Sequence, residues 1–173
     1  MHKLEQEMVA RVSPSAVWKV LEQFGDVCQW APGMHSSSLS GEQASGVGTR
    51  RAMRHRWGFR IEEEVTRWTD GQGMSFVLLK APFPMQNVHE TWDIEALNGT
   101  TRIVTTVTYE MGVGVFGALL DQLFVRSIVE REMRRGLQAL IAFAGEDASP
   151  AKPDYCPGIP GEQPINHFNT RED

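Results

Sequence analysis

Residues 86–110, QNVHETWDIEALNGTTRIVTTVTYE, indicate two antiparallel strands joined by a tight turn at Asn98-Gly99. Asn-Gly between two strand-like runs is a strong signal for a two-residue hairpin turn. Directly opposed residues in such a hairpin share a face of the sheet, and their numbers have a constant sum. The predicted pairs are Ile94 with Ile103, Trp92 with Thr105, Glu90 with Val107, and Val88 with Tyr109. This hairpin therefore has a largely apolar face that contains one carboxylate, Glu90.

Two further turns predict the register of the strands that precede this hairpin. The pairs expected around Asp70-Gly71 are Val65 with Phe76, Glu63 with Leu78, and Ile61 with Lys80. The pairs expected around a three-residue loop at 56–58 are His55 with Phe59, Met53 with Ile61, and Arg51 with Glu63. Both hairpins share the strand at 59–68 and place its residues 59, 61, 63 and 65 on one face. By the same parity, Trp68 is expected on the outer face.

The rest of the chain completes an α+β pattern. A strand at 3–12 is followed by a helix that begins at Ser13-Pro14 and by a short helical turn at 26–30. Strand-like runs follow at about 34–41, 48–55, 59–68, 74–80, 86–97 and 100–110, and then a helix at about 117–144. Because tight turns join the strands, we expect an antiparallel sheet whose concave face is filled by the last helix.

Composition and charge narrow the possible functions. A length of 173 residues suits one domain, which we expect over 1–145, followed by a tail at 146–173 that holds five of the nine prolines. The tail carries most of the net charge of −5, so the nearly neutral body argues against nucleic-acid binding. The sequence contains no CxxC or HExxH motif and indicates no metal or other cofactor. The N-terminal residues lack the apolar run of a secretory signal, so the sequence predicts a cytoplasmic protein.

Charged residues on the predicted inner face leave two interpretations open. Arg51, His55, Glu63, Lys80 and Glu90 are all expected among apolar neighbours, where an unpaired carboxylate is costly. One interpretation is a structural ion pair between Arg51 and Glu63, together with an error in the register at Glu90. The other is a ligand cavity between the sheet and the last helix, apolar with a few polar groups. Its mouth would lie among the loops 56–58, 81–84 and 111–117, which carry Trp57, Phe83 and Phe116.

Several short motifs, in this order and spacing, resemble the START/SRPBCC superfamily and within it the polyketide cyclase/dehydrase group. They are Ser13-Pro14-x-x-Val17-Trp18, Trp30-Ala31-Pro32-Gly33, Gly46-Val47-Gly48-Thr49-Arg50-Arg51, Ile61-Glu62-Glu63-Glu64-Val65, Pro82-Phe83-Pro84 and Gly99-Thr100-Thr101-Arg102. The resemblance covers about 1–145 and implies a helix-grip fold, in which a curved seven-stranded antiparallel sheet holds an elongated cavity against the long helix. It implies a lipid, sterol, polyketide, quinone or hormone as ligand. Arg51 and Glu63 look like the arginine and glutamate that line the pocket of the related abscisic-acid receptors.

The inner-face residues then become candidates for chemistry. Glu63 and Glu90 could serve as general acid and base, with Arg51 as an oxyanion-binding group and Lys80 in the same role near the mouth. The ligand-binding candidates are Met53, His55, Trp57, Ile61, Phe76, Leu78, Lys80, Phe83, Val88, Trp92, Thr105, Val107, Tyr109 and Phe116. Two functions remain: a metal-free polyketide cyclase, dehydratase or aromatase, and a non-catalytic lipid or quinone carrier or regulatory binder.

Three surface features have both a plain and a functional interpretation. Arg50, Arg54, His55, Arg56 and Arg60 form either a solvated hairpin or a basic surface for an anionic membrane or an acyl-carrier protein. The charged stretch 130–135 is interpreted as the solvated face of the last helix. The tail at 146–173 could cap the mouth or pack on a second copy of the chain in a homodimer.

Overall fold

The computed structural model describes residues 1–112 and 124–145, and these form one curved sheet with helices on one face. The strands are β1 (His2–Ala10), β2 (Met34–Leu39), β3 (Arg50–His55), β4 (Arg60–Thr69), β5 (Gly73–Lys80), β6 (Met85–Leu97) and β7 (Thr100–Met111). The helices are α1 (Pro14–Leu21), the 3₁₀ helix η1 (Phe24–Gln29) and α3 (Arg126–Gly145). The sheet order is β1-β7-β6-β5-β4-β3-β2, antiparallel throughout. The predicted α+β helix-grip fold is therefore confirmed.

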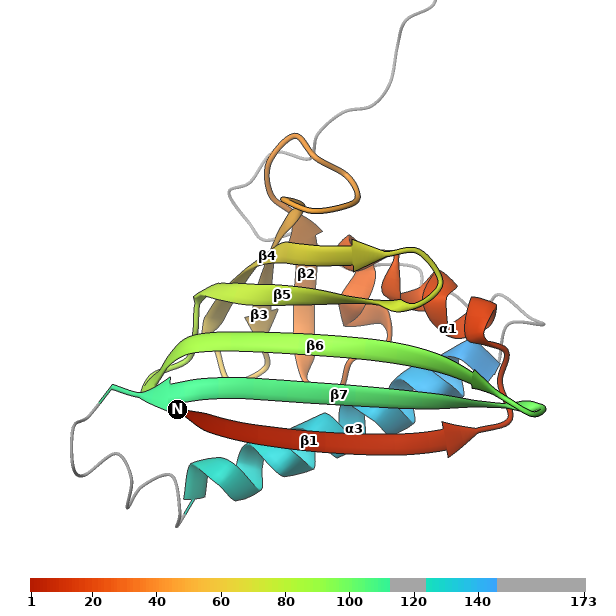
Figure 1. Cartoon of the computed structure of the whole chain (residues 1–173). Helices are drawn as coiled ribbons and strands as arrows, with labels where there is room; N and C mark the ends of the chain where they lie inside the picture. Colours follow the sequence, from red (N-terminus) through yellow and green to blue (C-terminus); the bar gives the residue numbers. More distant parts are fainter. Residues whose placement is uncertain (113–123, 146–173) are drawn as a thin grey trace, which may run out of the picture.

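The helices pack against both ends of the strand order. In Figure 1, α3 runs behind β6, β7 and β1, while β2 and β3 cross the direction of these strands because the sheet is strongly curved. Helix α3 packs against β1, β7 and α1, and η1 packs against β2. None of the described helices is long and apolar enough to cross a membrane.

Local sequence explains where α1 begins and ends. The hydroxyl Oγ of Ser13 accepts a hydrogen bond from the backbone N–H of Ala16 at 3.1 Å, and proline occupies the first helical position. The apolar face of the helix, Val17, Trp18, Val20 and Leu21, is buried. The helix ends at Leu21, and the chain then turns into η1.

Two of the three predicted turns have the expected geometry. Leu97 lies opposite Thr100 across Asn98-Gly99, so the pairs predicted from Glu90 to Ile94 are confirmed. The 56–58 loop closes with a hydrogen bond from the backbone N–H of His55 to the carbonyl of Phe59 at 2.9 Å. Its glycine, Gly58, has φ +88, a conformation that residues with a side chain rarely adopt.

The Asp70-Gly71 turn differs from the prediction. Thr69 lies opposite Gly73, so the loop contains three residues, and a register shift between Val65 and Arg67 then restores the predicted pair of Val65 with Phe76. Because this shift reverses the parity beyond it, the expectation that Trp68 points outward was wrong. The ring of Trp68 packs edge-on against Trp18 of α1, with 5.2 Å between centroids.

Three clusters of buried apolar side chains form the core. The largest joins α1, the middle of the sheet and the C-terminal half of α3, where Leu137 and Leu140 are fully buried. A second lies between β1, β6, β7 and Met133 of α3, and a third joins Val27 of η1 to β3 and β4. Members of all three clusters also line a common internal cavity.

Candidate functional site

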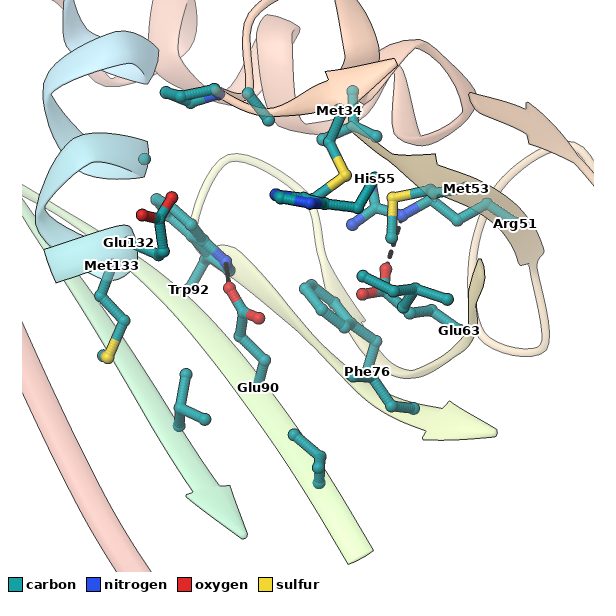
Figure 2. A pocket seen from close by; sticks show the side chains of 18 of the residues that line it. Met34, Arg51, Met53, His55, Glu63, Phe76, Glu90, Trp92, Glu132 and Met133 are labelled. Carbon is teal, nitrogen blue, oxygen red and sulfur yellow. Dashed lines mark hydrogen bonds and ion pairs between the residues drawn. The ribbon is translucent and has the colours of Figure 1, made fainter. Parts of the chain in front are cut away.

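The cavity lies between the sheet, η1 and α3, and has a volume of about 280 Å³. Most of its wall is apolar, with methionine, phenylalanine and tryptophan side chains contributed by the sheet, by η1 and by α3. Figure 2 shows the charged side chains that reach into it: Arg51, Glu63 and Glu90 from the sheet, and Glu132 from α3. A mostly apolar pocket with a few polar groups is the usual form of a small-molecule site.

Arg51 and Glu63 form a buried ion pair in the wall. The Nε of Arg51 donates to Oε2 of Glu63 at 2.6 Å, and Nη1 donates to the backbone carbonyl of Phe24 at 2.9 Å. The guanidinium carbon lies 3.9 Å from the ring centroid of Phe24 and 5.2 Å from that of Phe76. Arg51 and Glu63 lie directly opposite each other on β3 and β4, as predicted from the 56–58 loop. Burial raises the pKa of Glu63, and the charge of Arg51 opposes this rise.

Glu90 is the second carboxyl group of the cavity, and no Lys or Arg among the described residues forms an ion pair with it. Its Oε1 accepts a hydrogen bond from the indole N–H of Trp92 at 2.6 Å, two residues along the same face of β6. Burial, and then the negative charge of Glu63, raise the pKa of Glu90 to about 7, while Trp92 and Arg51 act in the opposite direction. The side chain of Glu90 is half-buried and faces the cavity. Because its pKa is raised to about 7, both of its protonation states are available near neutral pH.

Only β5 separates the strands that carry the two carboxyl groups, and Phe76 lies between them in Figure 2. Adjacent strands lie about 4.8 Å apart, so β4 and β6 are about 10 Å apart, and Glu63, opposite Leu78, is offset by two residues along the strands from Glu90, opposite Phe76. A ligand ring lying over Phe76 could therefore meet a carboxyl group on each side.

The end of the cavity beside the 56–58 loop contains His55, Trp57 and Glu132. The imidazole of His55 stacks on Phe59 with 4.5 Å between centroids, and its Nδ1 accepts the backbone N–H of Trp57 at 3.3 Å. Burial and the charge of Arg56 lower the pKa of His55, while Glu132 raises it. The ring is therefore neutral at neutral pH, with its proton on Nε2.

The structure brings most of the predicted site residues together. Those that line the cavity are Arg51, Met53, His55, Trp57, Ile61, Glu63, Phe76, Leu78, Val88, Glu90, Trp92 and Val107. Phe116 lies outside the described residues.

Four predicted residues do not line the cavity. Lys80 pairs with Glu62 instead of Ile61, because the register shifts between Glu62 and Glu63, and its side chain is exposed. Phe83 is 84% exposed, and the neighbouring Pro82 lines the cavity instead.

Thr105 and Tyr109 lie on the inner side of β7, where other protein groups cover them. Both residues are fully buried, and the ring of Tyr109 stacks on His2 with 5.2 Å between centroids. Helix α3 packs against this strand, so the two side chains contribute to the core rather than to the cavity wall.

Sequence reasoning missed the helical side of the cavity. Phe24 and Val27 of η1 and a stripe on α3 line it, the stripe consisting of Ile128, Val129, Glu132, Met133 and Gly136. The assignment of Glu132 to the solvated face was therefore wrong. The spacing of three and four residues between these positions is the signal that could have identified the stripe.

Of the five residues of the predicted basic cluster on the 50–60 hairpin, three do not contribute a free positive charge to the surface. Arg50 pairs with Glu64, Arg60 pairs with Glu62, and His55 points inward. Arg54 and Arg56 are exposed. Within residues 1–112 and 124–145, no group of three or more His, Cys, Asp or Glu side chains is placed to hold a metal ion.

A family model described as polyketide cyclase/dehydrase and lipid transport matches residues 1–144. Several solved structures share the fold. The protein TTHA0849 from Thermus thermophilus is 20% identical with a TM-score of 0.70, over 86% of this chain and 100% of that one. Ara h 8.0201 is 16% identical with a TM-score of 0.69, over 84% and 98%. XoxI from Bacillus cereus is 19% identical with a TM-score of 0.67, over 86% and 99%. No curated protein matches the sequence significantly.

Proposed function

The chain belongs to the polyketide cyclase/dehydrase and lipid-transport family, and on this basis we propose that its cavity binds a polyketide-, lipid- or quinone-like molecule and that Glu90 exchanges a proton with it. The apolar wall supports a hydrophobic ligand, and the few polar side chains support one that also carries oxygen or nitrogen groups. A volume of about 280 Å³ is just below the usual range for such pockets and favours a compact, ring-sized ligand.

The observation that carries the catalytic part of the proposal is the environment of Glu90. A general base works best when its pKa lies near the operating pH, and burial raises the pKa of Glu90 to about 7. Its hydrogen bond to Trp92 holds Oε1 in place, which leaves Oε2 to meet a ligand. A carboxyl group placed in this way can take a proton from a ligand and return it.

Dehydration of a β-hydroxy ketone illustrates the chemistry. The Glu90 carboxylate removes the proton next to the carbonyl, and the released electron pair forms the new carbon–carbon double bond as the carbon–oxygen bond to the hydroxyl breaks. Glu90 then gives its proton to the departing hydroxide, which leaves as water, and the carboxylate is restored. Arg51 has N–H donors beyond those used by Glu63 and Phe24, and these can stabilise the charge that develops on the carbonyl oxygen.

Passive carriage is the second candidate, and one observation favours it. The polar groups in the wall already have protein partners: Arg51 bonds to Glu63, and Glu90 accepts from Trp92. Such a cavity can hold an apolar ligand while these polar groups keep their hydrogen bonds to the protein. The same residues would then select the ligand without reacting with it.

Exchange of a ketone α-proton separates the two candidates without knowledge of the natural ligand. The probe is 1-tetralone in deuterated buffer, with deuterium incorporation followed by NMR and binding measured by calorimetry. We expect the wild-type protein to accelerate exchange, and Glu90→Gln to lose the acceleration while still binding the ketone. Glu95→Gln is the matched control, because Glu95 is exposed on the same strand and pairs with Arg102. Binding of 1-tetralone without accelerated exchange would refute the catalytic candidate and leave the carrier.

A further inference from the structure

We propose that the cavity selects ligands whose polar group is neutral or positively charged, such as a hydroxyl, a carbonyl, an amide or an amine, and discriminates against carboxylates. This inference rests on the proposed binding function and specifies its ligand class. Its basis is the set of charged side chains that line the cavity: the carboxyl groups of Glu63, Glu90 and Glu132 and the guanidinium of Arg51.

The positive charge of Arg51 is already neutralised. Its side chain is 8% exposed, and its guanidinium bonds to Glu63 at 2.6 Å and to the carbonyl of Phe24 at 2.9 Å. A ligand carboxylate that approached Arg51 would also approach Glu63, and two carboxylates at one guanidinium repel each other. Arg51 can therefore donate a hydrogen bond to a neutral oxygen, but it offers no net positive charge to an anion.

No other Lys or Arg lines the cavity in the described part of the chain. Lys80, which the sequence predicted inside, is exposed on the surface, and His55 is neutral because burial and Arg56 lower its pKa. Residues 113–123 contain no Lys, Arg or His in the sequence. Arg135 donates to Glu132 at 3.0 Å, so an exposed arginine next to the cavity is also paired with a carboxylate.

With Arg51 paired to Glu63 and Glu132 paired to Arg135, Glu90 is the charge left uncompensated among the described residues of the wall, and it makes the cavity negative. Figure 2 shows Glu90 reaching in from the sheet and Glu132 from α3. Charges in a poorly hydrated cavity interact more strongly than in water, so a ligand carboxylate would be repelled while a ligand N–H or O–H could donate to Glu90.

A matched series of naphthalenes tests this selectivity on the wild-type protein. The probes are 1-naphthoic acid, 1-naphthamide and 1-naphthylmethylamine, which differ mainly in the charge of one small substituent, and affinity is measured by calorimetry at about pH 8. We expect the amide and the amine to bind at least about tenfold more tightly than the acid. Acid affinity equal to or above that of the amide would overturn the inference but leave the binding function intact. Failure of all three probes to bind would contradict the proposed function itself.

Two variants identify the charges responsible. Glu90→Gln should narrow the difference between amide and acid, and Glu95→Gln, on the outer face of the same strand, should leave it unchanged. Glu63→Gln frees the charge of Arg51, so we expect the acid to gain affinity relative to the amide. If the ratio of amide affinity to acid affinity is unchanged in both Glu90→Gln and Glu63→Gln, with the folded state verified by circular dichroism, these two carboxyl groups are not the cause of the selectivity.

Discussion

The Arg51–Glu63 ion pair offers a quantitative test of the inner face, because the neighbouring residues form a matched pair on the outer face. Arg50 and Glu64 lie opposite each other on the same two strands, and their contact of 2.5 Å is as short as the 2.6 Å contact of the inner pair. The side chains of the inner pair are 8% and 5% exposed, and those of the outer pair 56% and 27%. The two pairs thus differ mainly in burial.

Burial sets the expected cost of breaking each pair. Arg51→Met leaves the Glu63 carboxyl and the Phe24 carbonyl without their donor, and removing one partner of a buried pair costs about 3–5 kcal/mol. Arg50→Met removes a solvent-screened pair, which is worth about 0–1 kcal/mol. In the double variant Arg51→Met/Glu63→Leu neither charge of this pair remains, so we expect most of the lost stability to return.

Urea denaturation at pH 7 measures the free energy of unfolding of the wild type, Arg51→Met, Arg50→Met and the double variant. The slope of each transition checks that the unfolded state is unchanged. Equal and small losses for Arg51→Met and Arg50→Met would show that the inner pair is solvated, and the description of the cavity wall would be wrong. A double variant as unstable as Arg51→Met would refute the role assigned to the unpaired carboxyl.

Three further predictions concern the cavity and its rim. Because the pKa of Glu90 is raised from 4.5 to about 7, the folded protein holds this proton more tightly than the unfolded chain does. Its stability should therefore fall as pH rises between these values, with a contribution from Glu90 of at most about 3 kcal/mol, and Glu90→Gln should make this slope smaller in urea denaturation while the raised pKa of Glu63 still contributes in the same direction. Trp92→Phe removes the donor to the carboxylate and should raise the pKa of Glu90 further; an unchanged pKa in carbon-13 NMR would contradict this. Gly33→Ala should destabilise the fold more than Gly41→Ala in the same urea assay. Both glycines have positive φ, but only at Gly33 would a Cβ lie 2.6 Å from Nε2 of His55. Equal losses of stability would show that backbone strain alone matters.

The inward direction of the charged residues could be predicted because turn chemistry is local. Asn98-Gly99 and the 56–58 loop each fix the pairing of their own strands, and those registers place Glu90, Glu63 and Arg51 on the inner face. The partner of Arg51 was predicted for the same reason. The partner of Glu90, the indole of Trp92, lies two residues away on the same face and could have been found from that spacing.

The side-chain directions that were predicted wrongly lie where the backbone is irregular or where a tertiary contact decides the direction. The predicted register at Asp70-Gly71 missed a three-residue loop and two register shifts, and these reversed the directions expected for Trp68 and Lys80. Such bulges depend on the curvature of the whole sheet rather than on a short motif. The inward position of Glu132 depends on how α3 is seated on the sheet, which helical periodicity alone does not determine.

Methionine methyl groups offer the most direct test of the central claim, that a small molecule occupies the space between the sheet and α3. Of the eight methionines, Met34, Met53, Met74, Met85 and Met133 line the cavity, whereas Met1, Met8 and Met111 do not. With carbon-13-labelled methionine methyls and added 1-naphthamide, the five lining resonances should shift together and the other three should stay in place. Shifts confined to Met1, Met8 or Met111, or no shift at a concentration where calorimetry detects binding, would contradict this account.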